Sequence, residues 1–295
     1  NVGQINTQDW IRAADELTQS LLLSGAINSV AGKPKVLMIG RIKNNTTQHI
    51  DTDSLVKKIR VALNKGGRAL TTTAVGLNGP EDESSKALVL RGEGRAFCTG
   101  ADLTHFQGVF KDPARLRAYL DQINDTMFLL ENLPIPVVAV VHGYALAGGM
   151  ELMMACDMVL VTEHARIGDQ HVNFGLIPGG GSTQRLPRRV GMQRAMELLT
   201  TARWLSGAEA VEWGLALRAV PEDQLDEELE KLLSLLRTKS RPGLGWIKSV
   251  ASRGADLAIR DGVALESRAF VEYATTSTHP TDGVQAFVEK RSIEF

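Results

Sequence analysis

Two glycine-rich turns in the chain have the composition of a site that binds a negatively charged oxygen. The first is residues 95–103 (RAFCTGADL), after the apolar run 87–90 (ALVL), and the second is residues 143–151 (GYALAGGME), after 136–141 (PVVAVV). Each apolar run predicts a buried strand that leads through the turn into a helix, where backbone N–H groups lack partners within the helix. Two such groups directed at one point form an oxyanion hole, in which each donor stabilises a transition state by about 3 kcal/mol.

One acidic side chain, Glu151, is set in the apolar segment that follows the second turn. The residues after it, 152–155 (LMMA), are all apolar. Burial among them desolvates the carboxylate, which raises its pKa and suits it to general acid/base catalysis. The alternative is a structural glutamate that accepts hydrogen bonds from helix N–H groups. The residues alone leave both roles open.

A second candidate pair, Asp169 and His171, lies in the segment 168–175 (GDQHVNFG). An imidazole titrates near neutral pH and can form an acid/base pair with a carboxyl group. Asp169 either orients His171 or acts itself, and the alternative for His171 is a loop histidine bonded to the backbone. We expect His171 to lie in the active site, with its catalytic role open at this point.

The composition excludes several classes of protein. The 295 residues are 43% hydrophobic, enough for a large core in one or two domains, and the net charge of −1 predicts no nucleic-acid partner. No apolar run approaches ~20 residues, so no membrane span is expected, and no cysteine or histidine cluster has the spacing of a metal site. The two cysteines, Cys98 and Cys156, lie in apolar segments and are predicted to be buried free thiols.

The elements that must position these groups alternate between strand and helix from Ala87 onward. The pattern predicts strands at 157–161 and 217–220 and a loop at 166–178. Helices are predicted at 113–131, 182–190, 193–202, 207–213, 223–239, 242–253, 255–275 and 280–291. Before Lys86, the pattern predicts helices at 9–23 and 54–64, strands at 35–42 and 69–75, and a polar loop at 78–85.

The two turns, in this order and wording, resemble the crotonase (enoyl-CoA hydratase/isomerase) superfamily very closely, from about Ala87 to the end of the chain. The resemblance implies an α/β fold with a core of repeated ββα units in a spiral and a C-terminal helical trimerisation region. It also implies an acyl-CoA enzyme of fatty acid metabolism that stabilises a thioester enolate. The oxyanion-hole donors carried over are the N–H groups of Ala101 and Gly148. The family resemblance that the two turns carry also favours a catalytic Glu151.

The same resemblance implies where coenzyme A binds. Thr99, Ala101 and Leu103 match backbone positions that wrap the CoA adenine. Phe287 and Lys290 match a C-terminal helix that reaches CoA, commonly that of a neighbouring subunit, and a lysine suits phosphate groups. We therefore expect an acyl-CoA substrate, no permanently bound cofactor, a homotrimer or hexamer, and a cytoplasmic location.

His171 is the main departure from the hydratase pattern, because it aligns with the second catalytic glutamate of hydratases. Two glutamates hold the attacking water in that pattern, and one glutamate with an imidazole need not run the same reaction. The expected enzyme is a hydratase- or isomerase-like lyase or isomerase. The alternative in the same fold is a hydrolase of CoA thioesters or of β-dicarbonyl C–C bonds.

The front of the chain resembles a different family, the bacterial lipoproteins that activate penicillin-binding proteins. The stretches 33–40 (KPKVLMIG), 44–53 (NNTTQHIDTD) and 71–75 (TTTAV) carry this resemblance. The chain is thus interpreted as a fusion, natural or engineered, of an α-β-α-β segment at 1–86, a crotonase core at 87–220 and a C-terminal helical region at 221–295. The front segment either replaces the usual crotonase start, or it makes the chain a non-catalytic scaffold that docks on a penicillin-binding protein.

Overall fold

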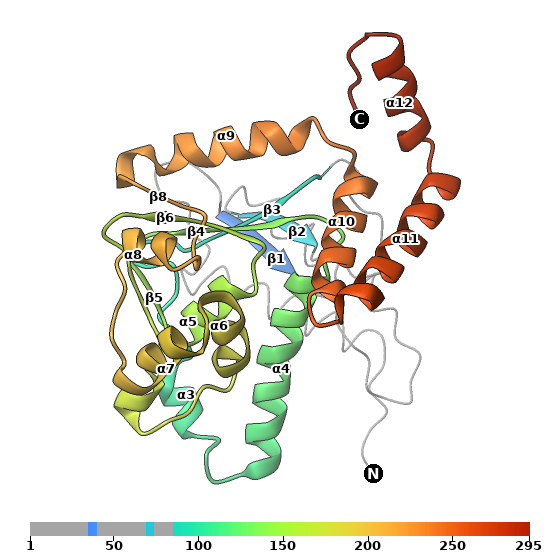
Figure 1. Cartoon of the computed structure of the whole chain (residues 1–295). Helices are drawn as coiled ribbons and strands as arrows, with labels where there is room; N and C mark the ends of the chain where they lie inside the picture. The colour runs from blue at the N-terminus through green and yellow to red at the C-terminus, as the bar shows by residue number, and fades with distance from the viewer. Residues whose placement is uncertain (1–34, 40–68, 74–84) are drawn as a thin grey trace, which may run out of the picture. The chain divides into compact units, whose positions relative to one another are not determined.

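The front segment contains one pair of parallel strands. The computed structural model describes residues 35–39, 69–73 and 85–295, and the chain divides into two units at 1–83 and 84–295 (Figure 1). In the first unit, β1 (Lys35–Ile39) pairs in parallel with β2 (Ala69–Thr73). Both strands predicted there are confirmed. The helices predicted at 9–23 and 54–64 lie outside the described residues.

A parallel sheet in the order β3-β4-β6-β8 forms the centre of the second unit. Its strands are β3 (Leu88–Arg91), β4 (Val137–Val141), β6 (Met158–Thr162) and β8 (Arg218–Val220). All five residues of β4 are buried. A continuous run of valine and alanine suits a strand that is covered on both faces, as the strands of parallel sheets usually are.

Helix α9 (Leu225–Arg237) packs on this sheet and closes one side of the core. Their contact is a cluster of buried side chains, namely Val138, Val140, Leu160, Leu225 and Leu232. Each of these side chains contributes roughly 2 kcal/mol to stability by leaving water. Figure 1 shows α9 along one side of the sheet and α4 to α7 on the other.

A second, smaller sheet pairs β5 (Tyr144–Leu146) in parallel with β7 (Arg166–Gly168). The loop predicted at 166–178 is therefore wrong at its beginning, and a 3₁₀ turn at His171–Phe174 interrupts it further on. Strands of three residues are too short to show an alternating pattern. They form here because a partner strand from another part of the chain accepts and donates their hydrogen bonds.

The remaining helices agree with the predicted ones to within a few residues at their ends, apart from the short helix after the first turn, for which no range was predicted. They are α3 (Leu103–Gln107), α4 (Pro113–Asn132), α5 (Gly148–Met154), α6 (Ser182–Val190), α7 (Met192–Thr201), α8 (Gly207–Glu212), α10 (Arg241–Gly254), α11 (Ile259–Thr276) and α12 (His279–Val288). Side chains fix several helix starts. Asp112 accepts the N–H groups of Ala114 and Arg115 at the start of α4, and Ser206 forms a capping box with Glu209 at α8.

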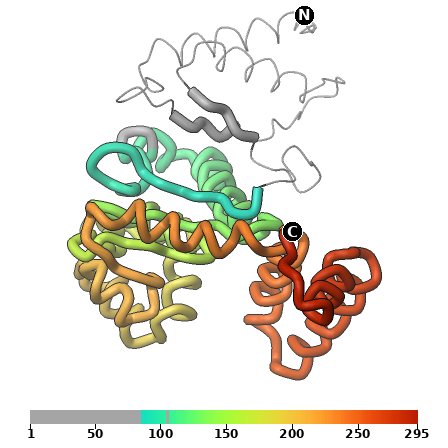
Figure 2. Tube along the Cα trace, turned by 90° about the horizontal axis from the view of Figure 1, so that it is seen from above, coloured from blue at the N-terminus to red at the C-terminus, as the bar shows by residue number. Residues whose placement is uncertain are grey.

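Helices α10 to α12 extend to one side of the sheet, and both Figure 1 and Figure 2 show α11 and α12 standing apart from the strands. Of the helices in the described part of the chain, none has both the length and the apolar character that a membrane crossing requires. Both cysteines are free thiols, as predicted. Cys156 is buried, and burial raises its thiol pKa to about 12, but Cys98 is only half-buried because it lies in the first turn.

Candidate functional site

Backbone hydrogen bonds join the two glycine-rich turns into one structure. The N–H of Phe97 donates to the carbonyl of His142 (3.0 Å), and that of Cys98 donates to Tyr144 (3.1 Å). In the opposite direction, the N–H of Leu146 donates to the carbonyl of Cys98 (3.0 Å). This ladder brings together two segments that are remote in sequence.

Glycines allow the two turns to approach closely. A Cβ atom on Gly100 would lie 3.2 Å from the nitrogen of Gly148, and one on Gly148 would lie 3.7 Å from the nitrogen of Ala101. A Cβ on Gly149 would lie 1.9 Å from the carbonyl oxygen of Cys98, a distance that no side chain tolerates. The backbone amides of Ala101 and Gly148 therefore belong to facing segments with no side chain between them.

The residue before the second amide is strained. Ala147 has φ 49° and ψ −119°, a conformation that costs a residue with a Cβ about 1–3 kcal/mol. This conformation turns the chain from β5 into α5, whose first residue is Gly148. Among the hydrogen bonds of the described residues, none uses the N–H of Ala101 or of Gly148 as donor. The two groups are thus available to an outside oxygen.

Glu151 lies in α5, one turn after Gly148, and it is only 2% exposed. Its Oε1 accepts the N–H of Gly180 (2.8 Å) and the N–H of Ser182 (3.0 Å). Burial raises the pKa of Glu151, and the N–H groups of Ser182 and Gly180 and the charge of His171 act in the opposite direction without cancelling it. The carboxyl group is therefore held by backbone amides near the start of α6, and its raised pKa suits proton transfer. Both the structural and the catalytic alternative considered for Glu151 have support in these contacts.

Asp169 and His171 form a hydrogen-bonded pair. Asp169 is 0% exposed, and its Oδ1 lies 2.8 Å from Nδ1 of the His171 ring and accepts the backbone N–H of His171 (3.2 Å). Burial lowers the pKa of His171, but the hydrogen bond and charge of Asp169, with the charge of Glu151, outweigh it and raise the pKa. Because Asp169 engages Nδ1, the other ring nitrogen, Nε2, is the one that can meet a reactant.

The residues expected to contact CoA fall into two groups. Thr99, Ala101 and Leu103 are exposed on the first turn, next to the facing amides. Phe287, in contrast, is 84% exposed on α12, and Figure 1 shows α12 away from α3 and α5. Lys290 directly follows this helix. Within one chain, the fold brings the first group to the candidate site and leaves the second group distant from it.

Three polar residues of the site were missed by the sequence analysis. Asn124 and Glu131 lie on α4 and Arg185 lies on α6. Asn124 and Arg185 bond to the turn that anchors Glu151, and Glu131 holds Arg185. Asn124 lies among the inward-facing apolar residues of its helix, an unusual place for a polar side chain. That position was the only signal, and nothing in the sequence connects it with a turn so far along the chain.

Comparison with known proteins gives these features a context. The family described as enoyl-CoA hydratase/isomerase matches residues 71–295. A probable enoyl-CoA hydratase of Rhizobium meliloti (strain 1021) is 36% identical over 215 residues, covering 72% of this chain and 81% of that protein. A crotonyl-CoA hydratase of Syntrophomonas wolfei is 34% identical over 216 residues, 73% of this chain and 82% of the relative. The crystal structure of an enoyl-CoA hydratase from Bacillus anthracis has a TM-score of 0.68 at 30% identity, covering 90% of this chain and 97% of that one.

A second family, described as the peptidoglycan-synthase activator LpoB, matches residues 9–84. The predicted resemblance of the front segment is thus confirmed, and the chain joins parts of two families. The hydratase/isomerase match begins at residue 71, earlier than the expected start near Ala87, so the two matched ranges share residues 71–84. The division into domains at 1–86, 87–220 and 221–295 stays a prediction.

Proposed function

We propose that this chain, which belongs to the enoyl-CoA hydratase/isomerase family, converts acyl-CoA thioesters through an enolate intermediate. The observation that supports this most directly is the approach of the Ala101 and Gly148 amides beside the buried carboxyl group of Glu151. Two backbone donors suit a thioester oxygen that becomes negatively charged, and a carboxyl group with a raised pKa suits proton transfer next to it.

In hydration, the oxygen of water bonds to the β-carbon as one of its O–H bonds breaks. The electron pair of the C=C bond then moves towards the thioester, whose oxygen carries the charge, and a proton is finally added to the α-carbon. In isomerisation, a proton leaves one carbon and is returned to another through the same enolate. In both reactions, the amides of Ala101 and Gly148 stabilise the enolate oxygen and Glu151 moves a proton.

The roles of the other site residues follow from their contacts. Since Oε1 of Glu151 accepts two N–H groups, its Oε2 is the oxygen assigned to proton transfer. His171, held through Nδ1 by Asp169, supplies the second proton-transfer group through Nε2. Asp169 is a positioning residue, because its hydrogen bond fixes the tautomer and orientation of the ring. Thr99 and Leu103 contact the CoA moiety beside the first turn.

The test is an assay with crotonyl-CoA as the probe. Hydration removes the absorbance of the conjugated enoyl thioester without releasing a thiol, so the two signals are followed together. Loss of enoyl absorbance with no free CoA supports the proposal. A folded protein that neither changes this substrate nor shifts the double bond of a β,γ-enoyl-CoA contradicts it.

A hydrolase is the second candidate, and the Asp169–His171 pair favours it. A histidine that is oriented by a buried carboxylate can take a proton from water, which then attacks a thioester or a β-dicarbonyl carbon. In thioester hydrolysis, the C–S bond breaks and CoA leaves as the thiol after taking up a proton. Release of free CoA, lost in His171→Ala, identifies this reaction.

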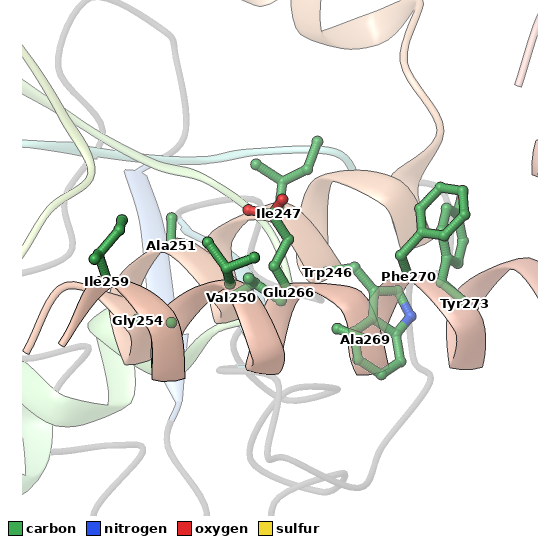
Figure 3. A pocket seen from close by; sticks show the side chains of 12 residues that line it. Trp246, Ile247, Val250, Ala251, Gly254, Ile259, Glu266, Ala269, Phe270 and Tyr273 are labelled. Carbon is green, nitrogen blue, oxygen red and sulfur yellow. The ribbon is translucent and has the colours of Figure 1, made fainter. Parts of the chain in front are cut away.

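The substrate site is proposed to be completed by a second copy of the chain in a trimer or hexamer. Large apolar side chains are exposed along α10 to α12, namely Ile247, Ile259, Val263, Phe270, Val271, Val284, Phe287 and Val288. A groove of about 420 Å³ runs between α10 and α11 and is lined largely by apolar side chains (Figure 3). A monomer seldom leaves so much apolar surface in water, which supports a neighbouring copy as its occupant. Phe287 and Lys290 then contact the CoA bound to that neighbour.

The match of residues 9–84 to a peptidoglycan-synthase activator favours a further role in binding. In that case the chain docks on a penicillin-binding protein, and the second unit serves as a scaffold. Co-precipitation of the full chain with a purified penicillin-binding protein tests this role. No binding, together with turnover of crotonyl-CoA, excludes the scaffold reading.

A further inference from the structure

The turn at residues 179–182 holds the carboxyl group of Glu151 through two successive donors on one oxygen. Gly180 and Ser182 both donate their N–H groups to Oε1, at 2.8 and 3.0 Å. A Cβ atom on Gly180 would lie 2.5 Å from Oε2 of Glu151, so a larger residue there would displace this carboxyl group. The position of this carboxyl group therefore depends on how the peptide planes of the turn are oriented.

Asn124 fixes the first of these peptide planes. Its Nδ2 donates to the carbonyl of Gly179 (2.9 Å), which belongs to the same planar peptide unit as the N–H of Gly180. In a trans peptide, the C=O and N–H bonds point in opposite directions. With its carbonyl bound to Asn124 on one side, this peptide unit directs its N–H to the opposite side, where Glu151 lies.

Arg185 fixes the next peptide plane. Its Nη1 donates to the carbonyl of Gly180 (2.7 Å), while Nε and Nη2 form a two-pronged contact with the carboxylate of Glu131 at 2.6 and 3.1 Å. Both charged side chains are largely shielded, so this ion pair is stronger and better defined than one at the open surface. Helix α4 thus holds the Gly179–Gly180 peptide unit directly through Asn124. It holds the Gly180–Gly181 unit, which precedes the unit that carries the Ser182 amide, through Glu131 and Arg185.

We propose that α4 sets the orientation of the proton-transfer group through these two peptide units, so that Asn124 and Arg185 are positioning residues for Glu151. The proposal rests on the catalytic role proposed for Glu151. Neither residue touches Glu151 through its own side chain in the described hydrogen bonds. Asn124 holds the carbonyl of the peptide unit that donates the Gly180 N–H, and Arg185 holds the Gly180–Gly181 unit, which lies between the two donating units.

A consequence for proton affinity separates positioning from simple stabilisation. Burial raises the pKa of Glu151, and the N–H groups of Ser182 and Gly180 oppose that rise. Without Asn124, the Gly179–Gly180 peptide is free to rotate, and the carboxylate loses a donor. The protonated form is then favoured further, so the pKa rises. A carboxylate that accepts a proton must be ionised, so the acidic limb of the pH–rate profile moves to higher pH.

The experiment compares Asn124→Ala with Asn132→Ala in the full chain. Both asparagines lie on α4 and bond the carbonyl of the residue four positions earlier, Leu120 (2.9 Å) and Phe128 (2.7 Å) respectively. Asn132 makes no hydrogen bond to the turn within the described part of the chain, so it is the matched control. Two measurements are made on each variant: the pH dependence of kcat with crotonyl-CoA, and a ¹³C NMR titration of the glutamate carboxyl carbons. The Glu151 signal is identified by its loss in Glu151→Gln.

We expect Asn124→Ala to lower kcat by ~10-fold or more with little change in KM, as displaced catalytic groups do. In this variant, the acidic limb of the pH–kcat profile and the titration of Glu151 both move to higher pH. Asn132→Ala gives the same kcat, pH profile and titration as the unmodified chain. Arg185→Lys keeps the positive charge but loses the two-pronged contact with Glu131. We expect it to move the acidic limb and the Glu151 titration to higher pH as well, and it replaces Asn124→Ala in the test if that variant does not fold. The proposal is overturned if the folded variants keep the Glu151 titration and the acidic limb of the unmodified chain, even if their Tm is lowered. Full turnover by Glu151→Gln instead refutes the proposed function, while the NMR titration still tests the positioning.

Discussion

The two glycine-rich turns are tied to each other by backbone hydrogen bonds of 3.0–3.1 Å, and Glu151 beside them is buried and bonded. The outer faces of α10 to α12 differ in kind, since they present large apolar side chains to solvent around an open groove. The side chains of the first region are bonded within the chain, whereas those of the second are not covered by the described residues. Under the proposed function, the comparison teaches that one chain supplies the groups for chemistry, whereas a second copy is needed to complete the groups that hold CoA.

Glu151→Gln is expected to have the largest effect, because it removes the proton-transfer group beside the two glycine-rich turns and leaves α10 to α12 unchanged. Loss of such a group typically lowers kcat by ~10²–10⁴. CoA binding stays nearly unchanged, because it depends on other residues. Turnover of crotonyl-CoA and calorimetric binding of CoA measure the two effects, and Glu163→Gln, at an exposed carboxyl group outside the site, is the control. A near-normal kcat would remove Glu151 from the mechanism.

A second prediction concerns His171 and its pH dependence. We expect His171→Ala to lower kcat by ~10²-fold rather than only raise KM, because proton transfer belongs to the transition state. His171→Glu should increase crotonyl-CoA hydration, since it restores two carboxyl groups. As a proton acceptor His171 must be neutral, so the rate falls as pH drops through its pKa, which Asp169 and Glu151 raise despite the opposing effect of burial.

Asp169→Asn provides the check on that pH dependence. It removes the charge that raises the pKa of His171, so the acidic limb should move to lower pH. A kinetically silent His171→Ala would make the histidine structural and leave the chemistry to Glu151 or Asp169.

A pair of glycine substitutions tests how tightly each region is packed. Gly149→Ala brings a Cβ to 1.9 Å from the carbonyl oxygen of Cys98 and should lower the free energy of unfolding by about 1–3 kcal/mol. Gly262→Ala on α11 meets its nearest atom, the carbonyl oxygen of Gly254, at an ordinary 3.6 Å. This change should stabilise the helix by about 0.5–1 kcal/mol. Urea unfolding measures both, and equal effects would show that the turns are not as constrained as their geometry indicates.

The smallest predicted change in turnover comes from the C-terminal helices. Val263→Glu places a charge in the groove of Figure 3 and should weaken association of the copies by about 2 kcal/mol or more. Light scattering should show smaller species, and KM for acyl-CoA should rise while kcat of the saturated enzyme changes little. Leu235→Glu, at an exposed apolar position on α9, controls for a general effect of charge. If the unmodified chain is already a monomer at micromolar concentration, a neighbouring copy does not complete the site.

Long and strongly patterned elements could be predicted from sequence. Helix α4 was expected at 113–131 and spans Pro113–Asn132, because its apolar spacing and the cap at Asp112 act locally. The strands β5 and β7 could not be predicted, because each has three residues and exists through its partner. The burial of Cys98 was overestimated for a related reason, since the apolar neighbours of a turn residue do not show which side of the turn faces solvent.

The sequence by itself determined which residues are proposed for the chemistry, because the backbone freedom of glycine and the ionisable groups of glutamate, aspartate and histidine belong to the residue types themselves. Only the tertiary structure decided how these groups are held. Asn124 lies 2.9 Å from the carbonyl of Gly179 because α4 lies against the turn at the start of α6, and Phe287 belongs to α12, which Figure 1 shows away from α3 and α5. Such contacts depend on the packing of whole elements, and no spacing of residues along the chain encodes them.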